Sequence, residues 1–389
     1  MSRCVTKGVG KMGTMAVLTA GLMLFAGAAA AQSTIKIGLI QPVTGPTAYD
    51  GQSVINGARL AESEVNAAGG VLGQKIEVLL QDGKSDPAES LSAAEKLLDR
   101  DKVRVLIGAW ASSATLAVMP LVQRYEVPLI VETSTAEKIT EMGNPWVFRT
   151  SSNSKIDADA LQPYLVKKLG FHKVAFMAAN NDFGRAVVTN WSRVLTPQGA
   201  TVVATEYHKP GETNFSPTLT KIKNSGADTI VITSDVTTAS NIIKQSYELG
   251  MTGFNRVITS GNPAEAIIKL AGKEASEGML VQNYWVPYAP PPGEEASSAK
   301  FVTSYKDRYP DRIADKYAVS GYDAVRLAAS AVRAAGSSEP AKIQAALRTI
   351  KMPGLQGMIA FDQQQQARPF QSVSRVENAA PVIVVKVEQ

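Results

Sequence analysis

Residues 105–137, VLIGAWASSATLAVMPLVQRYEVPLIVETSTAE, contain the pattern that decides the fold of the chain. Two short apolar runs, at residues 105–108 and 127–131, predict buried strands, and a helix is expected between them. Each run is followed by hydroxyl residues, first at Ser112 and then at Thr133. A strand, a helix and a second strand in this order are typical of a parallel α/β sheet.

The two hydroxyl clusters are expected to form a seat for a small carboxylate. Each follows the carboxyl end of a strand, where ligands bind in open parallel sheets. Helix starts collect unpaired N–H groups and the positive end of the helix dipole, which favour an anion. The spacing of Ser134 and Glu137 matches a capping box and predicts the second helix start. The alternative is that the hydroxyls only cap helices. The residues expected to contact the carboxylate are Ser112, Ser113, Thr133 and Thr135.

Strand and helix patterns alternate from Ile35 to Thr140 and again from His172 to Asn262. The first series includes a strong helix start at Asp86, which precedes a proline and, two residues further on, a glutamate. Because the same architecture occurs twice, the chain is expected to be an α/β protein with two Rossmann-like lobes. Each lobe is expected to be a parallel sheet covered on both faces.

The alternation changes near Arg149, Tyr284 and Gly354, which predicts three crossings between the lobes. Such crossings form a hinge that permits closure around a ligand. Arg149 is expected to form an ion pair at its crossing, and the glutamine run at residues 363–366 is expected to be a hairpin loop. The lobes are expected at residues 32–149 plus 286–353 and at residues 150–285 plus 354–389.

Residues 1–31 have the three parts of a cleavable signal peptide. Basic residues come first, an apolar run covers residues 12–25, and three alanines at residues 29–31 form a small-residue cleavage site. The alternative is a transmembrane anchor or a buried helix. The only cysteine, Cys4, lies in this leader, so the mature chain is expected to be an exported periplasmic protein without a disulfide.

The composition favours a soluble globular protein and argues against several functions. A length of 389 residues favours two domains. Removal of Arg3, Lys7 and Lys11 with the leader lowers the formal charge from +5 to +2, which argues against a nucleic-acid partner. The two histidines, His172 and His208, are expected at the surface. No nucleophile, metal or phosphate-loop motif occurs, so no catalysis, metal or cofactor is expected, and an exported hydrolase is the enzymatic alternative.

A series of short motifs runs through the chain after the leader. They are Ile37-Gly38-Leu39, Thr44-Gly45-Pro46, residues 66–73, Asp82 with Asp86-Pro87, Ile107-Gly108 with Ser112-Ser113, Phe148-Arg149, residues 181–184 and residues 276–278. No single motif is specific. Their order and spacing together resemble the type I periplasmic substrate-binding proteins of ABC importers, in the branched-chain amino acid-binding branch.

The resemblance implies an importer component that closes two lobes over a small amino acid and releases it unaltered. In that family, hydroxyls at the positions of Ser112, Thr133 and Thr135 bind the ligand carboxylate. The aromatic residue that closes over the ligand matches Phe183, and Tyr49 matches a second aromatic position approximately. The implied partner is an inner-membrane ABC permease, and the mature protein is expected to be a monomer.

One position departs from the family pattern and leaves the ligand open. Branched-chain amino acid binders place an acidic residue for the ligand ammonium where this chain has Ser260. Asp235, at the end of the preceding strand, either replaces that charge or only caps a helix. Trp110 is expected either in the pocket wall or in the core. An aromatic carboxylate or a small amide or urea therefore stays an alternative to a branched-chain or related aliphatic amino acid, and ligand sensing stays an alternative to transport.

Overall fold

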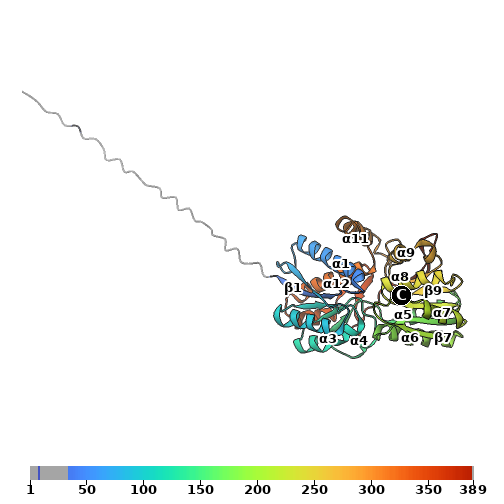
Figure 1. Ribbon diagram of the computed structural model, residues 1–389. Helices are drawn as coiled ribbons and strands as arrows, with labels where there is room; N and C mark the ends of the chain where they lie inside the picture. Colours follow the sequence, from blue (N-terminus) through green and yellow to red (C-terminus); the bar gives the residue numbers. More distant parts are fainter. Residues whose placement is uncertain (1–7, 9–33, 388–389) are drawn as a thin grey trace, which may run out of the picture. The chain divides into compact units, whose positions relative to one another are not determined.

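The computed structural model describes residue 8 and residues 34–387; apart from Gly8, the expected signal peptide lies outside the described residues. Residues 33–389 form one compact unit. The unit contains two large sheets (Figure 1). Buried hydrophobic clusters cover both faces of each sheet. The fold is therefore the two-lobed α/β architecture that the alternation of strands and helices predicts.

The first lobe is built on a parallel sheet in the order β2-β1-β3-β4-β5. Side chains of α1, α11, α12 and α13 pack on one face of this sheet, and those of α2, α3 and α4 pack on the other. The strands are β1 (Ile35–Gln41), β2 (Ile76–Asp82), β3 (Val105–Ile107), β4 (Leu129–Val131) and β5 (Val147–Arg149). The helices are α1 (Ala48–Ala67), α2 (Pro87–Glu95) with the π-helical turn η1 (Lys96–Arg100), α3 (Ser112–Tyr125), α4 (Lys138–Glu141), α11 (Glu295–Arg308), α12 (Lys316–Ala335) and α13 (Pro340–Leu347).

The second lobe is built on a sheet in the order β14-β13-β10-β9-β8-β6-β7, in which only β13 runs antiparallel to its neighbours. The sequence analysis did not identify β10 and β13 as strands. The strands are β6 (Lys173–Ala179), β7 (Thr201–His208), β8 (Thr229–Thr233), β9 (Asn255–Ile258), β10 (Leu280–Asn283), β13 (Ser372–Glu377) and β14 (Ala380–Lys386). The helices are α5 (Ser154–Leu165), α6 (Asp182–Leu195) with the 3₁₀ turn η2 (Thr196–Gln198), α7 (Ser216–Asn224), α8 (Val236–Glu248), α9 (Ala264–Ala271) and α10 (Lys273–Ser276).

Three segments connect the lobes: residues 150–153, 284–294 and 361–371. The third crossing lies later in the chain than the expected boundary at residue 354. A hairpin of β11 (Lys351–Gly354) and β12 (Gly357–Ala360) precedes it, and Leu355 and Ile359 are buried in the core of the first lobe. The glutamine run at residues 363–366 consequently belongs to this crossing and is not a hairpin loop, because the strands on either side of it lie in different sheets.

Arg149, at the end of β5, is fully buried beside the third crossing. Its guanidinium donates hydrogen bonds to Gln366 Oε1 at 2.5 Å, to the carbonyl of Ala136 at 2.5 Å and to Thr140 Oγ1 at 2.9 Å. Within residues 34–387 it forms no ion pair, so the ion pair expected from the sequence is wrong. Neutral carbonyl and hydroxyl oxygens satisfy the buried donors instead.

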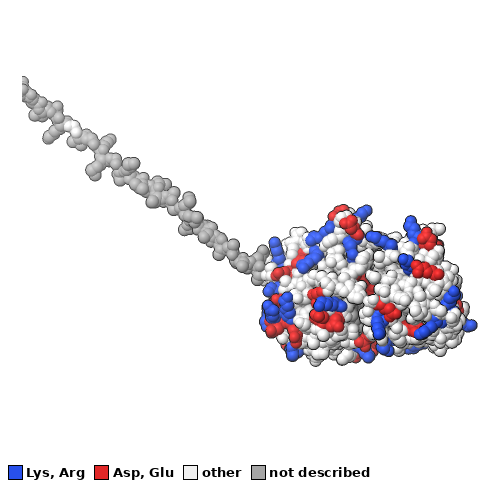
Figure 2. Space-filling view, viewed as in Figure 1, with Lys and Arg blue, Asp and Glu red and all other residues white. Residues whose placement is uncertain are grey.

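One face of the outer surface mixes charges of both signs. On the face shown in Figure 2, acidic and basic side chains are interspersed over both sheets. Within residues 34–387, no helix combines the length and the apolar character that a membrane span requires.

Helices α1 and α12 pack through a glycine on each. A Cβ atom at Gly57 would lie 1.8 Å from the carbonyl oxygen of Ala318, and one at Gly321 would lie 2.1 Å from that of Val54. Both separations are far below van der Waals contact, so the two helix backbones touch directly. This contact fixes the start of α12 against α1 in the core of the first lobe.

We predict that Gly321→Ala lowers the free energy of unfolding by about 1–3 kcal/mol, because overpacking outweighs the roughly 1 kcal/mol that alanine gains in helix propensity. Urea denaturation would measure the change. The matched control is Gly253→Ala, since a Cβ atom at Gly253 has no neighbour within 4 Å. Equal or higher stability of Gly321→Ala would contradict close packing of the two backbones.

Candidate functional site

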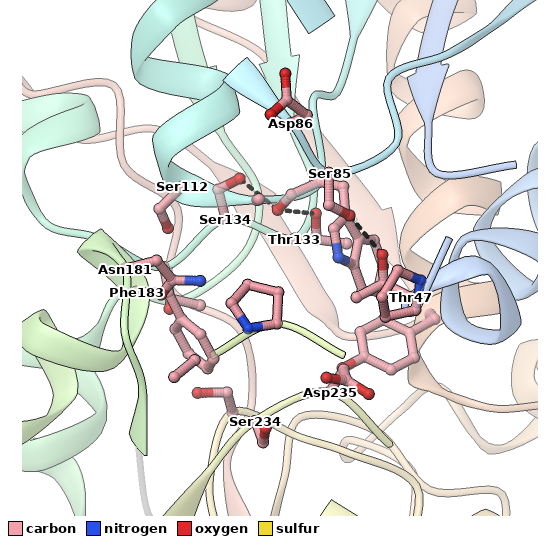
Figure 3. A pocket seen from close by; sticks show the side chains of 18 of the residues that line it. Thr47, Ser85, Asp86, Ser112, Thr133, Ser134, Asn181, Phe183, Ser234 and Asp235 are labelled. Carbon is pink, nitrogen blue, oxygen red and sulfur yellow. Dashed lines mark hydrogen bonds between the residues drawn. The ribbon is translucent and has the colours of Figure 1, made fainter. Parts of the chain in front are cut away.

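A cavity of about 260 Å³ lies between the two sheets. Residues that follow β3 and β4 line it from the first lobe, and residues that follow β6, β7, β8 and β9 line it from the second. Figure 3 shows Ser112 and Thr133 on one side of the cavity and Ser234 and Asp235 on the opposite side. The strand ends of both sheets therefore meet at one pocket, which is where ligands bind in open parallel sheets.

Most of the site residues expected from the sequence line this cavity, and two do not. Ser113 is the second residue of α3, and adjacent helical positions do not face the same side. The ring of Tyr49 lies under the Arg312 guanidinium, 4.2 Å from its centre, and is not a lining residue. The expected residues that line the cavity are Trp110, Ser112, Thr133, Thr135, Phe183, Asp235 and Ser260.

Two hydroxyls of the first-lobe wall have hydrogens that no protein acceptor uses. Ser112 Oγ accepts a hydrogen bond from the backbone N–H of Ala136 at 3.1 Å, so its own hydrogen is free to donate. Thr135 Oγ1 is buried, and it has no hydrogen-bond partner within residues 34–387. A buried polar group without a partner costs about 1–3 kcal/mol. Thr135 is therefore the strongest candidate in this wall for a donor to a ligand oxygen.

The hydroxyls of the neighbouring residues Thr133 and Ser134 already donate to a protein acceptor. Thr133 Oγ1 donates to the carbonyl of Trp110 at 3.2 Å, and Ser134 Oγ donates to the same carbonyl at 2.7 Å. Glu137 accepts a hydrogen bond from Ser154 Oγ at 3.0 Å. The capping box expected at Ser134 and Glu137 does not form, and α4 begins only at Lys138. The helix start predicted at this wall is wrong because tertiary partners take both of its side chains.

Both walls contain a non-glycine residue with a left-handed backbone. Trp110, after β3, has φ +67°, and Ser260, after β9, has φ +62°. Such conformations cost on the order of 1–3 kcal/mol and occur preferentially at ligand-binding sites. Each of the two residues follows the carboxyl end of a strand, and both line the cavity.

The second-lobe wall combines a helix cap with a buried histidine. Asp235 is the N-cap of α8, and its Oδ1 accepts a hydrogen bond from the backbone N–H of Thr238 at 2.9 Å. His208 lines the cavity and is 3% exposed, so its expected surface position is wrong. Its Nε2 lies 2.9 Å from Ser234 Oγ, which also lines the cavity. His208 is the last residue of β7 and is paired with Ala179 at the end of β6. Both residues line the cavity.

Lys316 and Tyr317 are lining residues that sequence reasoning missed. They open α12, and the ring of Tyr317 packs against that of Trp110 with 4.9 Å between centroids. Burial lowers the pKa of Lys316 to about 8. A lysine in the first turn of a helix interacts unfavourably with the helix dipole. This unusual placement was the signal in the sequence that could have identified Lys316 as a candidate site residue.

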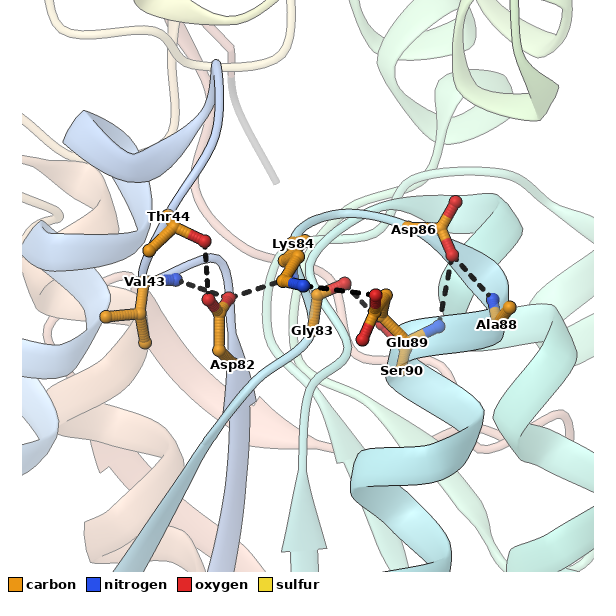
Figure 4. Close-up of polar contacts among 9 residues, drawn as sticks. All are labelled: Val43, Thr44, Asp82, Gly83, Lys84, Asp86, Ala88, Glu89 and Ser90. Atoms are coloured by element: carbon orange, nitrogen blue, oxygen red, sulfur yellow. Dashed lines mark hydrogen bonds and ion pairs between the residues drawn. The ribbon is translucent and has the colours of Figure 1, made fainter.

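Asp82 connects the loop that follows β1, residues 42–47, to the loop that follows β2, residues 83–86 (Figure 4). Its carboxylate accepts hydrogen bonds from the backbone N–H of Val43 at 3.0 Å, from Thr44 Oγ1 at 2.6 Å and from the backbone N–H of Lys84 at 2.9 Å. Partial burial raises the pKa of Asp82, but these hydrogen bonds outweigh it, and the net pKa is lowered. The loops joined in this way supply lining residues to the cavity, namely Pro46, Thr47, Lys84, Ser85 and Asp86.

We predict that Asp82→Asn lowers the free energy of unfolding at pH 7 by about 1–3 kcal/mol, because charge-assisted hydrogen bonds are lost. A folded-state pKa below the ordinary value near 3.9 means that the stabilisation is present above that pH and is lost as the pH falls further. Urea unfolding at pH 7 and at low pH would measure this. The exposed Asp311→Asn is the control, and a difference from the native protein that is equal at both pH values would contradict the role of the charge.

The fold and the cavity define a two-lobed ligand-binding protein. Residues 34–377 match the family model described as periplasmic binding protein, and the chain belongs to this family. Its members are non-catalytic solute-binding proteins, and this chain is of the ABC-transporter substrate-binding type.

Relatives cover almost the whole described chain. The Leu/Ile/Val-binding protein BraC3 of Rhizobium johnstonii is 28% identical over 331 residues, which cover 85% of this chain and 87% of that protein. The substrate-binding protein LivJ of Streptococcus pneumoniae, in complex with isoleucine, superimposes with a TM-score of 0.81 at 26% identity, covering 91% and 100% of the two chains. A solute-binding protein of an ABC transporter from Rhodopseudomonas palustris, in complex with 3,4-dihydroxybenzoic acid, superimposes with a TM-score of 0.79 at 25% identity. The match covers 91% of this chain and 98% of that chain.

Proposed function

We propose that this protein is the periplasmic solute-binding component of an ABC importer and that it takes a small carboxylate solute in the cavity between its lobes. The observation that carries the proposal is the buried, unpartnered hydroxyl of Thr135 in the cavity wall. Ser112 supports it with a free hydroxyl hydrogen at the first residue of α3, where the helix dipole also favours an anion. Relatives whose names or ligands include isoleucine and a dihydroxybenzoic acid share the carboxylate as their common group.

The available interactions suffice for binding without any chemical step. A hydrogen bond to a charged group contributes about 1.5–3 kcal/mol, and Ser112, Thr135 and helix-start N–H groups supply several. The rings of Trp110, Phe183 and Tyr317 line the cavity and offer apolar surface for the rest of the solute. Together these reach the roughly 8 kcal/mol of a micromolar site.

Transport requires that the solute changes the arrangement of the two lobes. Because each lobe supplies part of the wall, a bound solute contacts both and favours the arrangement in which they approach. The three crossings are the segments that would bend in this proposal. The closed form would then be presented to a multispan permease of the inner membrane.

The name of the BraC3 relative supports a branched-chain or related aliphatic amino acid as the solute, and the Rhodopseudomonas complex supports an aromatic acid. A calorimetric panel of L-leucine, L-isoleucine, benzoate, 3,4-dihydroxybenzoate and urea would test both classes on the mature chain. Binding of at least one carboxylate without turnover is expected. Binding of urea alone, or conversion of any solute, would contradict the proposal.

We predict that Ser112→Ala and Thr135→Val each weaken carboxylate binding at least tenfold, because each removes a donor to a charged group. Thr133→Val should weaken binding less, since the Thr133 hydrogen is used by the carbonyl of Trp110. Ser113→Ala is the matched control, one residue from Ser112 and outside the cavity lining. Calorimetry on the four variants would measure the order of their carboxylate affinities. Unchanged affinity in Ser112→Ala and Thr135→Val would contradict a carboxylate-binding site at these hydroxyls.

A further inference from the structure

Lys316 places a cation in the wall of the cavity, at the first residue of α12. The residue is 3% exposed, and its Nζ lies 4.0 Å from the ring centre of Tyr317 and 5.3 Å from that of Tyr284. Within residues 34–387, no hydrogen bond or ion pair reaches Nζ. Aromatic faces attract a cation without accepting its N–H groups as ordinary hydrogen bonds. The ammonium donors are therefore free for another acceptor.

The acids around Lys316 do not form a direct ion pair with it among the described residues. The four acids that face it electrostatically are Asp50, Asp315, Asp157 and Glu132. Burial raises the pKa of Asp157 to about 6 and that of Glu132 to about 7, and it raises the pKa of Asp50 well above its ordinary value. A buried cation without a direct counter-ion is costly, so an anion beside it is favoured.

The stem of Lys316 lies against the strand end that carries Ser260. A Cβ atom at Gly261, the next residue, would lie 3.2 Å from Lys316 Cε. Ser260 lines the cavity, and its buried hydroxyl has no hydrogen-bond partner within residues 34–387. An ammonium in this position would meet a hydroxyl and a buried like charge.

We infer that Lys316 is a ligand-contacting, specificity-determining residue, and that the pocket selects a net-anionic carboxylate without an α-amino group over the corresponding amino acid. This inference rests on the proposed carboxylate-binding function of the same cavity. Ser112 and Thr135 contact the carboxylate from the first-lobe wall, and the Lys316 ammonium supplies the charge that a neutral hydroxyl wall lacks. The excluded solute is a zwitterion, whose ammonium is repelled by the fixed cation.

Asp235 is the residue that would favour a zwitterion. It lines the cavity, but Oδ1 accepts from Thr238 and its charge stabilises the start of α8. Selection of an amino acid by Asp235 is therefore the competing outcome of the test.

The experiment compares solutes that differ only in the amine. Calorimetry on the native mature chain uses the pairs 4-methylpentanoate and L-leucine, and 3-phenylpropanoate and L-phenylalanine. The acid is expected to bind at least tenfold more tightly than the amino acid in the pair that fits the pocket. Lys316→Met is expected to weaken binding of the acid at least tenfold. Binding of the amino acid is expected to be unchanged or tighter. Lys316→Arg should retain most of the acid affinity, and Lys300→Met, on the exposed face of α11, is the matched control.

Two results would overturn the inference while leaving the proposed function intact. One is tighter binding of the amino acid than of its deaminated partner by the native protein, a comparison that needs no variant to fold. The other is equal acid affinity in Lys316→Met and the native protein, with Ser112→Ala and Thr135→Val still impaired. If neither these four solutes nor the carboxylates of the panel that tests the proposed function bind, the proposed function fails together with the inference.

Discussion

The carboxylate of Asp157 joins the segments on which the relation between the two sheets depends. It is buried near the start of α5, just after the first crossing, and burial raises its pKa to about 6. The hydroxyl of Tyr284, from the second crossing, donates to Oδ2 at 2.6 Å, and Gln371 Nε2, from the third, donates to Oδ1 at 3.1 Å. This carboxylate thus accepts hydrogen bonds from the second and third crossings, while its own helix, α5, follows the first crossing. A buried polar network of this kind resists partial rearrangement, because any single break leaves an unsatisfied group.

The same network continues into the wall of the cavity. Gln371 Oε1 accepts from Gln282 Nε2 at 3.2 Å, and Gln282 Oε1 accepts from the backbone N–H of Ser260 at 3.0 Å. In the other direction, the ring of Tyr284 packs at Gly261 and faces the ammonium of Lys316. The crossings and the pocket are therefore one connected set of hydrogen bonds and ring contacts. A solute that contacts Ser260 or Lys316 acts directly on groups that hold the lobes in place, which is the physical requirement for coupling binding to closure.

The sequence predicted the features that depend on local pattern. The alternation of strands and helices indicated both lobes, and the residues just past β3 and β4 indicated a wall of the cavity because parallel strands end at one edge. Features that depend on contacts between distant segments were not predictable. The hydroxyl of Ser134 caps no helix because the carbonyl of Trp110 takes it, and Ser113 faces away from its neighbour on the same helix. His208 and Lys316 enter the cavity from a strand and a helix far apart in the sequence, and no local signal fixes where either side chain points.

The residues around the cavity carry costs that a folding sequence would otherwise avoid. The left-handed backbones of Trp110 and Ser260 cost on the order of 1–3 kcal/mol each, and the unpartnered hydroxyl of Thr135 costs about as much again. Buried clusters on both faces of each sheet, and the direct contact of α1 with α12, provide the stability that offsets these terms. Comparable costs occur elsewhere in the described chain, for example at the unpartnered Trp191 Nε1 and Arg375 Nε, but at the cavity two left-handed residues and an unpartnered hydroxyl line one pocket. Because local rules in natural proteins are broken mainly where function requires it, the coincidence of these three costs in one cavity supports the cavity as the functional site.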